Sequence, residues 1–114
     1  MSYMNEELEK AKPSKMYILI LDDVPVGHAV NTAAHASLAC YLRFGQSQSM
    51  QTWLNESFKK VSCRVSREQL EKALDLADNH VVMTESALGN RVMGAVFAPR
   101  PEWDAFFKTL SLWN

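Results

Sequence analysis

Three polar side chains that can exchange protons or donate hydrogen bonds share one face of a predicted helix. His28, Asn31 and His35 are spaced by three and four residues, which places them within about 60° of one another around a helix axis. His28 falls in the first turn, where the positive end of the helix dipole favours a neutral imidazole that can accept a proton. We therefore take His28 as a candidate general base. The alternative is a solvated helix face with no chemical role.

Acidic and hydroxyl groups stand at the ends of two predicted strands. Asp22 and Asp23 directly follow the apolar run at residues 16–21, and Thr84 and Glu85 close a later strand. If the two strands are neighbours, these groups meet at one edge of the sheet. Helix capping by the aspartates and ordinary turn hydrogen bonds at Thr84 and Glu85 are the alternatives.

Together these groups suggest hydrolysis or binding of a small acyl or amide compound. In this hypothesis His28 is the general base, and either Asp23 or Glu85 orients its ring. Asn31 donates a hydrogen bond to the carbonyl of the substrate. Further ligand contacts and an apolar rim of the pocket would come from His35, Thr84, Met83, Leu88 and Met93.

Metal and nucleotide sites are not expected. His28 and His35 lie about 10 Å apart along a helix axis and cannot both reach one zinc ion. The chain has four glycines and no glycine-rich phosphate loop. We therefore predict neither a metal nor a cofactor.

The elements that must position these residues can be read from the apolar pattern. The run at residues 16–21 does not alternate, which predicts a central strand covered on both faces. Pro25 and Gly27 interrupt the chain, and a helix is predicted from His28 to about Phe44. Its three-and-four spacing predicts one stripe packed on the sheet, formed by Val30, Ala33, Ala34, Ser37, Leu38, Tyr41 and Leu42.

The rest of the chain alternates between strands and helices. Ser66 and Gln69 have the spacing of a capping box and open a second long helix. Pro101 is predicted to begin a final helix with Trp103, Phe106, Phe107 and Leu110 on one side. The other predicted elements are a short helix at 50–57, strands at 58–65, 81–84 and 91–98, and a turn at 86–90.

This order predicts an α/β protein with three layers, in which helices flank a four-stranded mixed sheet. Residues 1–14 are polar and are predicted to form a flexible N-terminal tail. Residues 15–114 have the length of one domain. A non-catalytic binding or regulatory module is the alternative function, as a homodimer that associates through Trp53, Trp103 or Trp113.

The bulk composition limits the partners. With 12 basic and 13 acidic residues the chain has no field that would attract DNA. A local basic patch keeps RNA binding open, with Lys59, Lys60, Arg64 and Arg67 as its candidates. Cys40 and Cys63 are read as packing residues in a reducing compartment. No apolar stretch reaches ~20 residues, so neither a membrane span nor a signal peptide is expected, and we predict a cytoplasmic protein.

Residues 23–36 resemble a family signature. They read Asp-Val-Pro-Val-Gly-His-Ala-Val-Asn-Thr-Ala-Ala-His-Ala. The sequence is similar to Asp-Leu-x-Met-Gly-Lys-Gly-Lys-Ile-Ala-Ala-Gln-Cys-Ala-His-Ala of the second structural class of peptidyl-tRNA hydrolases, with a turn two residues shorter. The resemblance covers most of residues 15–112. It is closer still to an uncharacterised side branch of that superfamily, with a Leu-Pro-Val-Gly-x-Ala-x-Asn-x-Ala-Ala-His turn.

The resemblance implies a four-stranded mixed sheet flanked by helices, often dimeric, with the active site at the first strand-to-helix turn. It places the essential lysine of the family at His28, its acidic partner near Glu85 and its threonine near Met93. Histidine is not a permanent cation, and methionine has no hydroxyl group. Retained peptidyl-tRNA hydrolysis is therefore a third hypothesis, beside acyl hydrolysis and the dimeric binding module.

Overall fold

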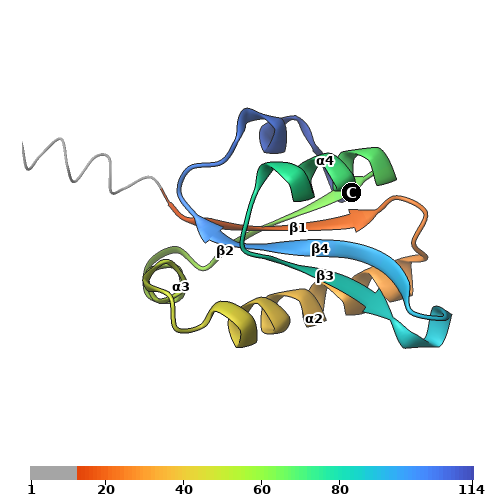
Figure 1. Ribbon diagram of the computed structural model, residues 1–114, viewed down its shortest axis with the longest axis horizontal. Helices are drawn as coiled ribbons and strands as arrows, with labels where there is room; N and C mark the ends of the chain where they lie inside the picture. Colours follow the sequence, from red (N-terminus) through yellow and green to blue (C-terminus); the bar gives the residue numbers. More distant parts are fainter. Residues whose placement is uncertain (1–12) are drawn as a thin grey trace, which may run out of the picture.

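A five-stranded mixed sheet lies at the centre of the protein. The computed structural model describes residues 13–114, so the predicted tail at residues 1–14 lies outside the description except for Pro13 and Ser14. The strands run in the order β3 (His80–Glu85), β4 (Arg91–Arg100), β1 (Lys15–Leu21), β2 (Lys59–Val65) and β5, and helices flank the sheet (Figure 1). The α/β class is confirmed, but the predicted number of four strands is wrong. The additional strand β5 (Ser111–Leu112) has two residues and pairs antiparallel with β2.

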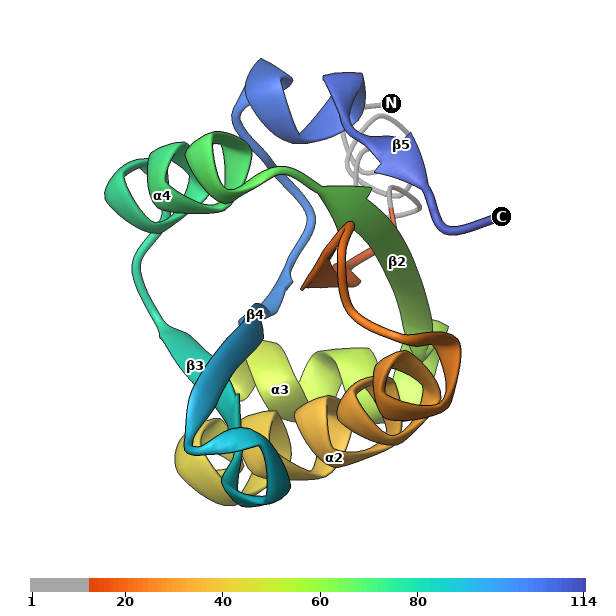
Figure 2. The same cartoon turned by 90° about the vertical axis from the view of Figure 1, so that its right-hand side faces the viewer.

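The first strand is buried on both faces, as its apolar run predicts. β1 (Lys15–Leu21) is buried from Met16 to Leu21 and pairs parallel with β2 and antiparallel with β4. Seen along the strands, α2 (Val26–Phe44) lies on one face of the sheet, and α4 (Arg67–Leu76) lies on the other (Figure 2). Because both faces are covered, the apolar side chains of β1 are removed from water on either side.

The face of α2 that packs on the sheet differs from the predicted one. The predicted stripe is largely in solvent, since Val30 is 62%, Leu38 58% and Leu42 74% exposed. The helix has two apolar faces, and the one with short side chains lies against the sheet. Short side chains let the helix axis approach strands whose own large side chains already fill the interior. The buried residues of α2 are Ala29, Thr32, Ala36 and Cys40.

The remaining elements follow the predicted order with shifted ends. They are α3 (Gln48–Thr52), the π-helix η1 (Trp53–Ser57), β2 (Lys59–Val65), α4, β3 (His80–Glu85), the 3₁₀ turn η2 (Ser86–Leu88) and β4 (Arg91–Arg100). The capping box that opens α4 is confirmed, because Ser66 accepts from the Gln69 N–H and the Gln69 side chain accepts from the Ser66 N–H. The predicted helix at Pro101 is wrong. Asp104 caps a 3₁₀ helix instead, η3 (Ala105–Thr109).

Trp53 and Trp103 pack into the interior rather than form an exposed surface. Trp53 is 2% exposed, and its indole N–H donates to the carbonyl of Lys59. Trp103 is half-buried, donates to the carbonyl of Arg100 and packs with Tyr17, Phe97 and Phe107. The expectation that tryptophan side chains form an association surface is therefore wrong for Trp53 and has no support at Trp103.

We expect the free energy of unfolding to fall as the pH rises from 9 to 11. Burial raises the pKa values of the Cys40 and Cys63 thiols from 9.0 to about 11. The thiols of the unfolded chain therefore lose their protons at lower pH than those of the folded chain, and this favours unfolding between pH 9 and 11. Below pH 9 the contribution of the two buried thiols to stability is complete. Each thiol should contribute about 2 to 3 kcal/mol to the loss. Urea titrations between pH 9 and 11 measure the free energy of unfolding. If it falls equally steeply with pH in a Cys40→Ala/Cys63→Ala double variant, the thiols are not the cause of the fall.

Candidate functional site

The junction between β1 and α2 is held by the backbone and leaves the start of the helix open. The Asp22 N–H donates to the carbonyl of Val65, and the Val24 N–H donates to the carbonyl of Leu21. Pro25 is the N-cap residue, and no side chain caps α2. Neither aspartate therefore plays the capping role that was the alternative to a functional one. The free N–H groups of the first turn can donate hydrogen bonds to an anionic or polarised oxygen.

Asp23 connects this junction to the hairpin of β3 and β4. Its carboxylate forms an ion pair with the guanidinium of Arg91, the first residue of β4. The Asp23 side chain is 70% exposed, so the pair contributes at most about 1 kcal/mol to stability. Its effect is to hold the loop before α2 beside the end of β3. Sequence reasoning did not identify Arg91, because the residues lie far apart in the chain.

Glu85 and Thr84 lie on opposite faces of the sheet. Ile20 pairs with Gly94, and Gly94 pairs with Met83, so Met83 shares the face of Ile20, which α2 covers. Because side chains alternate along a strand, Glu85 points to the α2 face and Thr84 to the other one. The structure therefore brings Glu85, and not Thr84, to the side of the sheet where His28 lies. Glu85 accepts a hydrogen bond from the Ala87 N–H at 3.2 Å.

His28 lies in the first turn of α2 and is half-buried. At about 100° per residue, its side chain points 140° or more away from those of Val30 and Ala33. Val30 and Ala33 line a recess together with Ile20 of β1 and Ser62 of β2, so His28 is turned toward the opposite flank of α2, beside β3 and β4. Among residues 13–114 its ring makes no hydrogen bond, so its nitrogens are free for a ligand or water.

The other predicted positions differ in burial. Asn31 and His35 are exposed on α2, about 60° and 20° from His28 around the helix axis and one and two turns further along it. Met93 is fully buried at an irregularity in the pairing of β3 and β4, where Met83 pairs with Gly94 and Thr84 with Val92. It therefore lies in the core and cannot form a pocket rim.

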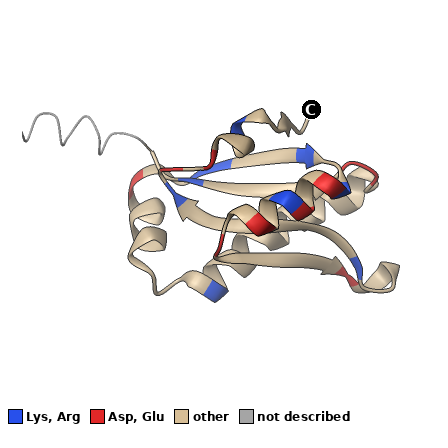
Figure 3. Ribbon diagram, turned by 45° about the horizontal axis from the view of Figure 1, so that its top comes forward, with Lys and Arg blue, Asp and Glu red and all other residues tan. Residues whose placement is uncertain are grey.

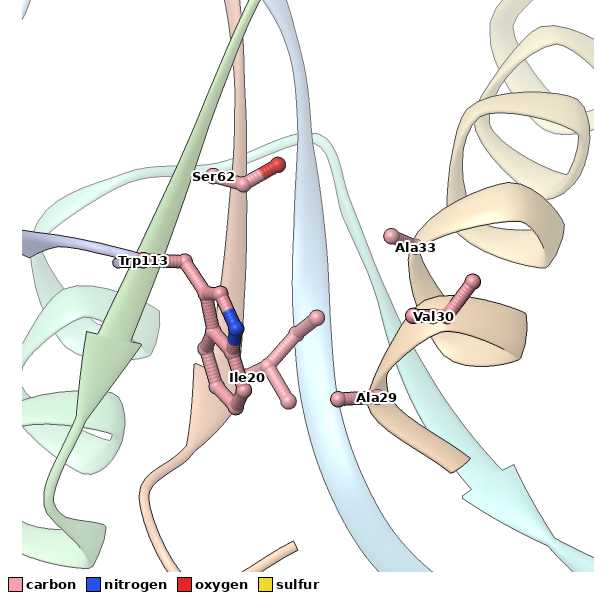
Figure 4. Close-up of a pocket in the computed structure, with 6 residues that line it drawn as sticks. All are labelled: Ile20, Ala29, Val30, Ala33, Ser62 and Trp113. Atoms are coloured by element: carbon pink, nitrogen blue, oxygen red, sulfur yellow. The ribbon is translucent and has the colours of Figure 1, made fainter. Parts of the chain in front are cut away.

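An apolar recess opens on the other flank of α2. It has a volume of about 280 Å³, and its wall consists of Ile20, Ala29, Val30, Ala33, Ser62 and Trp113. Figure 4 shows Trp113 and Ile20 on one side and the three α2 residues across from them. Ser62 supplies the polar side chain. Sequence reasoning missed this recess, because Trp113 reaches it only through the pairing of β5 with β2.

Two of the four cations of the predicted basic patch, Lys60 and Arg64, lie against aromatic rings. The Lys60 ammonium lies 3.5 Å from the centre of the Phe58 ring, and the Arg64 guanidinium lies 4.2 Å from the centre of the Trp113 ring. Arg64 also donates to the backbone oxygen of Asn114. These contacts place Arg64 at the rim of the recess and fix the indole that forms its wall.

In the part of the chain that the structure describes, no three His, Cys, Asp or Glu side chains are grouped so that they could hold a metal ion. Within the same residues, no helix is both long enough and apolar enough to cross a bilayer.

Comparison with known proteins gives one family. Residues 14–90, about two thirds of the chain, match the family described as peptidyl-tRNA hydrolase PTH2. The matched segment runs from the start of β1 to the turn after β3, and it includes Asp23, His28 and Glu85. Arg91 and Met93 lie beyond it. No curated protein matches the sequence.

Proposed function

The chain belongs to the peptidyl-tRNA hydrolase PTH2 family, and on this basis we propose that it hydrolyses a small acyl ester or amide at the start of α2. The observation that carries the proposal is the half-buried, unbonded His28 ring at a helix start that no side chain caps. Glu85 lies on the same face of the sheet, and Arg91 holds Asp23 at the same junction. A base, two carboxylates and free N–H groups are sufficient for acyl transfer to water.

In the proposed reaction His28 accepts a proton from water as the water oxygen attacks the acyl carbonyl. The negative charge that develops on the carbonyl oxygen is stabilised by the free N–H groups of the first turn of α2. When the bond to the leaving group breaks, the imidazolium returns the proton to the leaving oxygen or nitrogen. The products are a carboxylic acid and an alcohol or amine. Asp23 or Glu85 orients the imidazole ring for these proton transfers.

Small acyl compounds fit the surroundings of His28 better than a peptidyl-tRNA does. The apolar recess with Ile20 and Ala29 in its wall lies on the other flank of α2, away from the direction of His28, so it does not form part of this site. At position 28 the chain has a histidine in place of the family lysine that the resemblance assigns, and so it lacks a permanent cation for a phosphate.

The test compares two substrates that differ only in the leaving group. N-acetylphenylalanine methyl ester and N-acetylphenylalanyl-tRNA are incubated with the protein, and release of N-acetylphenylalanine is measured by mass spectrometry. We expect turnover of the methyl ester and, with the tRNA ester, no steep fall of kcat/KM with rising salt.

The outcomes separate the three hypotheses. Hydrolysis of the tRNA ester alone, with a steep salt dependence, would replace the proposal by retained peptidyl-tRNA hydrolysis. Absence of hydrolysis with both esters would contradict it and leave a non-catalytic binding module.

A further inference from the structure

The apolar recess beside α2 carries hydrogen-bond donors that the protein itself does not use. The indole N–H of Trp113 and the hydroxyl of Ser62 make no hydrogen bond within residues 13–114. The indoles of Trp53 and Trp103, in contrast, each donate to a backbone carbonyl. Figure 4 shows the Trp113 nitrogen and the Ser62 oxygen on the sides that face α2. No fully buried side-chain nitrogen or oxygen of these residues lacks a partner, so both donors are reached from solvent.

Arg64 adds a cation at the rim of the recess. It pairs with Ile20 in the parallel register of β1 and β2, so the two side chains point to the same face of the sheet. Its guanidinium lies 4.2 Å from the centre of the Trp113 ring and donates to the backbone oxygen of Asn114 at 3.3 Å. A guanidinium has further N–H groups, and no aspartate or glutamate of residues 13–114 forms an ion pair with this one. The indole therefore holds a cation that no carboxylate neutralises.

The elements that form the recess contain no acidic residue. Neither β1, β2, α2 nor β5 includes an aspartate or a glutamate. The acidic residues of α4 lie with that helix on the other face of the sheet (Figures 2 and 3). In the junction between β1 and α2, Asp23 is paired with Arg91, and Asp22 is exposed to solvent. An anion in the recess would therefore meet donors and positive charge from these four elements, without a competing carboxylate.

The interior of the recess suits a short apolar chain. Ile20 forms its floor on the sheet, and the short side chains of Ala29 and Ala33 leave space between α2 and the sheet. The recess has a volume of about 280 Å³. At about 30 Å³ for a group the size of a water molecule, it holds about nine such groups. A straight chain of about six to eight carbon atoms therefore fills it and leaves water for an apolar wall.

We propose that the recess binds a free carboxylic acid with a straight chain of about six to eight carbon atoms. The chain lies between Ile20 and the two alanines of α2, and the carboxylate lies at Arg64. The Trp113 indole N–H and the Ser62 hydroxyl are the further donors. A carboxylate only accepts hydrogen bonds, so it matches a rim that only has donors to offer. The recess and His28 lie on opposite flanks of α2, and this binding does not depend on hydrolytic activity.

Three probes with the same chain and different head groups test the preference for an anion. Octanoate, octanol and octylammonium are titrated into the full chain by isothermal calorimetry. We expect octanoate to bind with a Kd about tenfold or more below that of octanol, because its carboxylate accepts charge-assisted hydrogen bonds. Octylammonium should bind more weakly than octanol, since its charge repels Arg64. Equal affinities for the three probes, or no binding of octanoate, would overturn the proposal.

Two glutamine variants test the role of Arg64. Arg64→Gln should weaken octanoate binding about tenfold or more and leave octanol binding unchanged. Lys60→Gln is the matched control, because Lys60 is a cation on the same strand and the same face, lies against the Phe58 ring and does not line the recess. It should bind octanoate as the native chain does. Equal effects of the two substitutions on octanoate, or an equal loss of octanol binding in Arg64→Gln, would overturn the assignment of Arg64 to the carboxylate.

Two leucine variants test the position of the chain. Ala33→Leu places a larger side chain in the recess and should abolish binding of octanoate and octanol alike. Ala34→Leu is the matched control, at the next residue of the helix, which is exposed and does not line the recess. It should keep the native affinity for both probes. Thermal denaturation shows that each variant is folded. Native affinity for octanoate in Ala33→Leu would overturn the proposed site.

Discussion

Replacing Gly94 with alanine is expected to unfold most of the protein or to lower its free energy of unfolding by about 3 kcal/mol or more. Gly94 lies in the buried part of β4, between Ile20 of β1 and Met83 of β3. A Cβ atom at this position would lie 1.9 Å from the carbonyl oxygen of Leu19 and 2.9 Å from its carbonyl carbon. Both are backbone atoms of the central strand, so no side-chain rotation can relieve the overlap. Urea denaturation followed by circular dichroism measures the change.

Gly27→Ala is the matched control for this experiment. Gly27 is exposed in the first turn of α2, and a Cβ atom there meets nothing within 4 Å. Alanine costs less backbone entropy in a helix, so this variant should be more stable by about 0.5 to 1 kcal/mol. The measurement is made at protein concentrations low enough that association does not contribute. A Gly94→Ala variant whose free energy of unfolding is within 1 kcal/mol of that of the native chain would contradict the close backbone packing between β4 and β1.

Replacing His28 with alanine is expected to lower kcat for the acyl ester by about 10²- to 10⁴-fold, with little change in KM. The imidazole accepts the proton of the attacking water, so its loss acts on the transition state more than on substrate binding. Because the side chain is only half-buried and makes no hydrogen bond within residues 13–114, the substitution should leave the melting temperature nearly unchanged. Steady-state kinetics and thermal denaturation separate the two effects.

His35→Ala is the matched control. His35 is exposed two turns further along the same helix. It has the same side chain as His28, but it lies away from the uncapped start of α2 and from the carboxylates at that junction. It should hydrolyse the ester at the native rate. If the His28 and His35 variants have equal activity, His28 is not the base and the proposed mechanism is wrong.

Local signals in the sequence were sufficient for several parts of the structure. The unbroken apolar run of β1 predicts a strand buried on both faces, because six consecutive apolar side chains alternate between two faces and both must leave water. Ser66 and Gln69 predict the start of α4, since the capping box is formed by neighbouring residues alone. The family could also be predicted from the sequence, because its signature is a short stretch of residues around the turn before α2. Such features depend on residues close together in the chain.

The faces and the neighbours were decided by tertiary structure. α2 carries apolar residues on two sides, so its periodicity cannot say which side meets the sheet, and the close approach of Ala29 and Ala36 decides it. The pairing of β3 with β4 determines the face of the sheet to which Glu85 and Thr84 each point. The recess forms only because the pairing of β5 with β2 brings Trp113 to its wall. Arg91 reaches Asp23 for the same reason. In each case the decisive contact joins residues far apart in sequence, and only the packed chain brings them together.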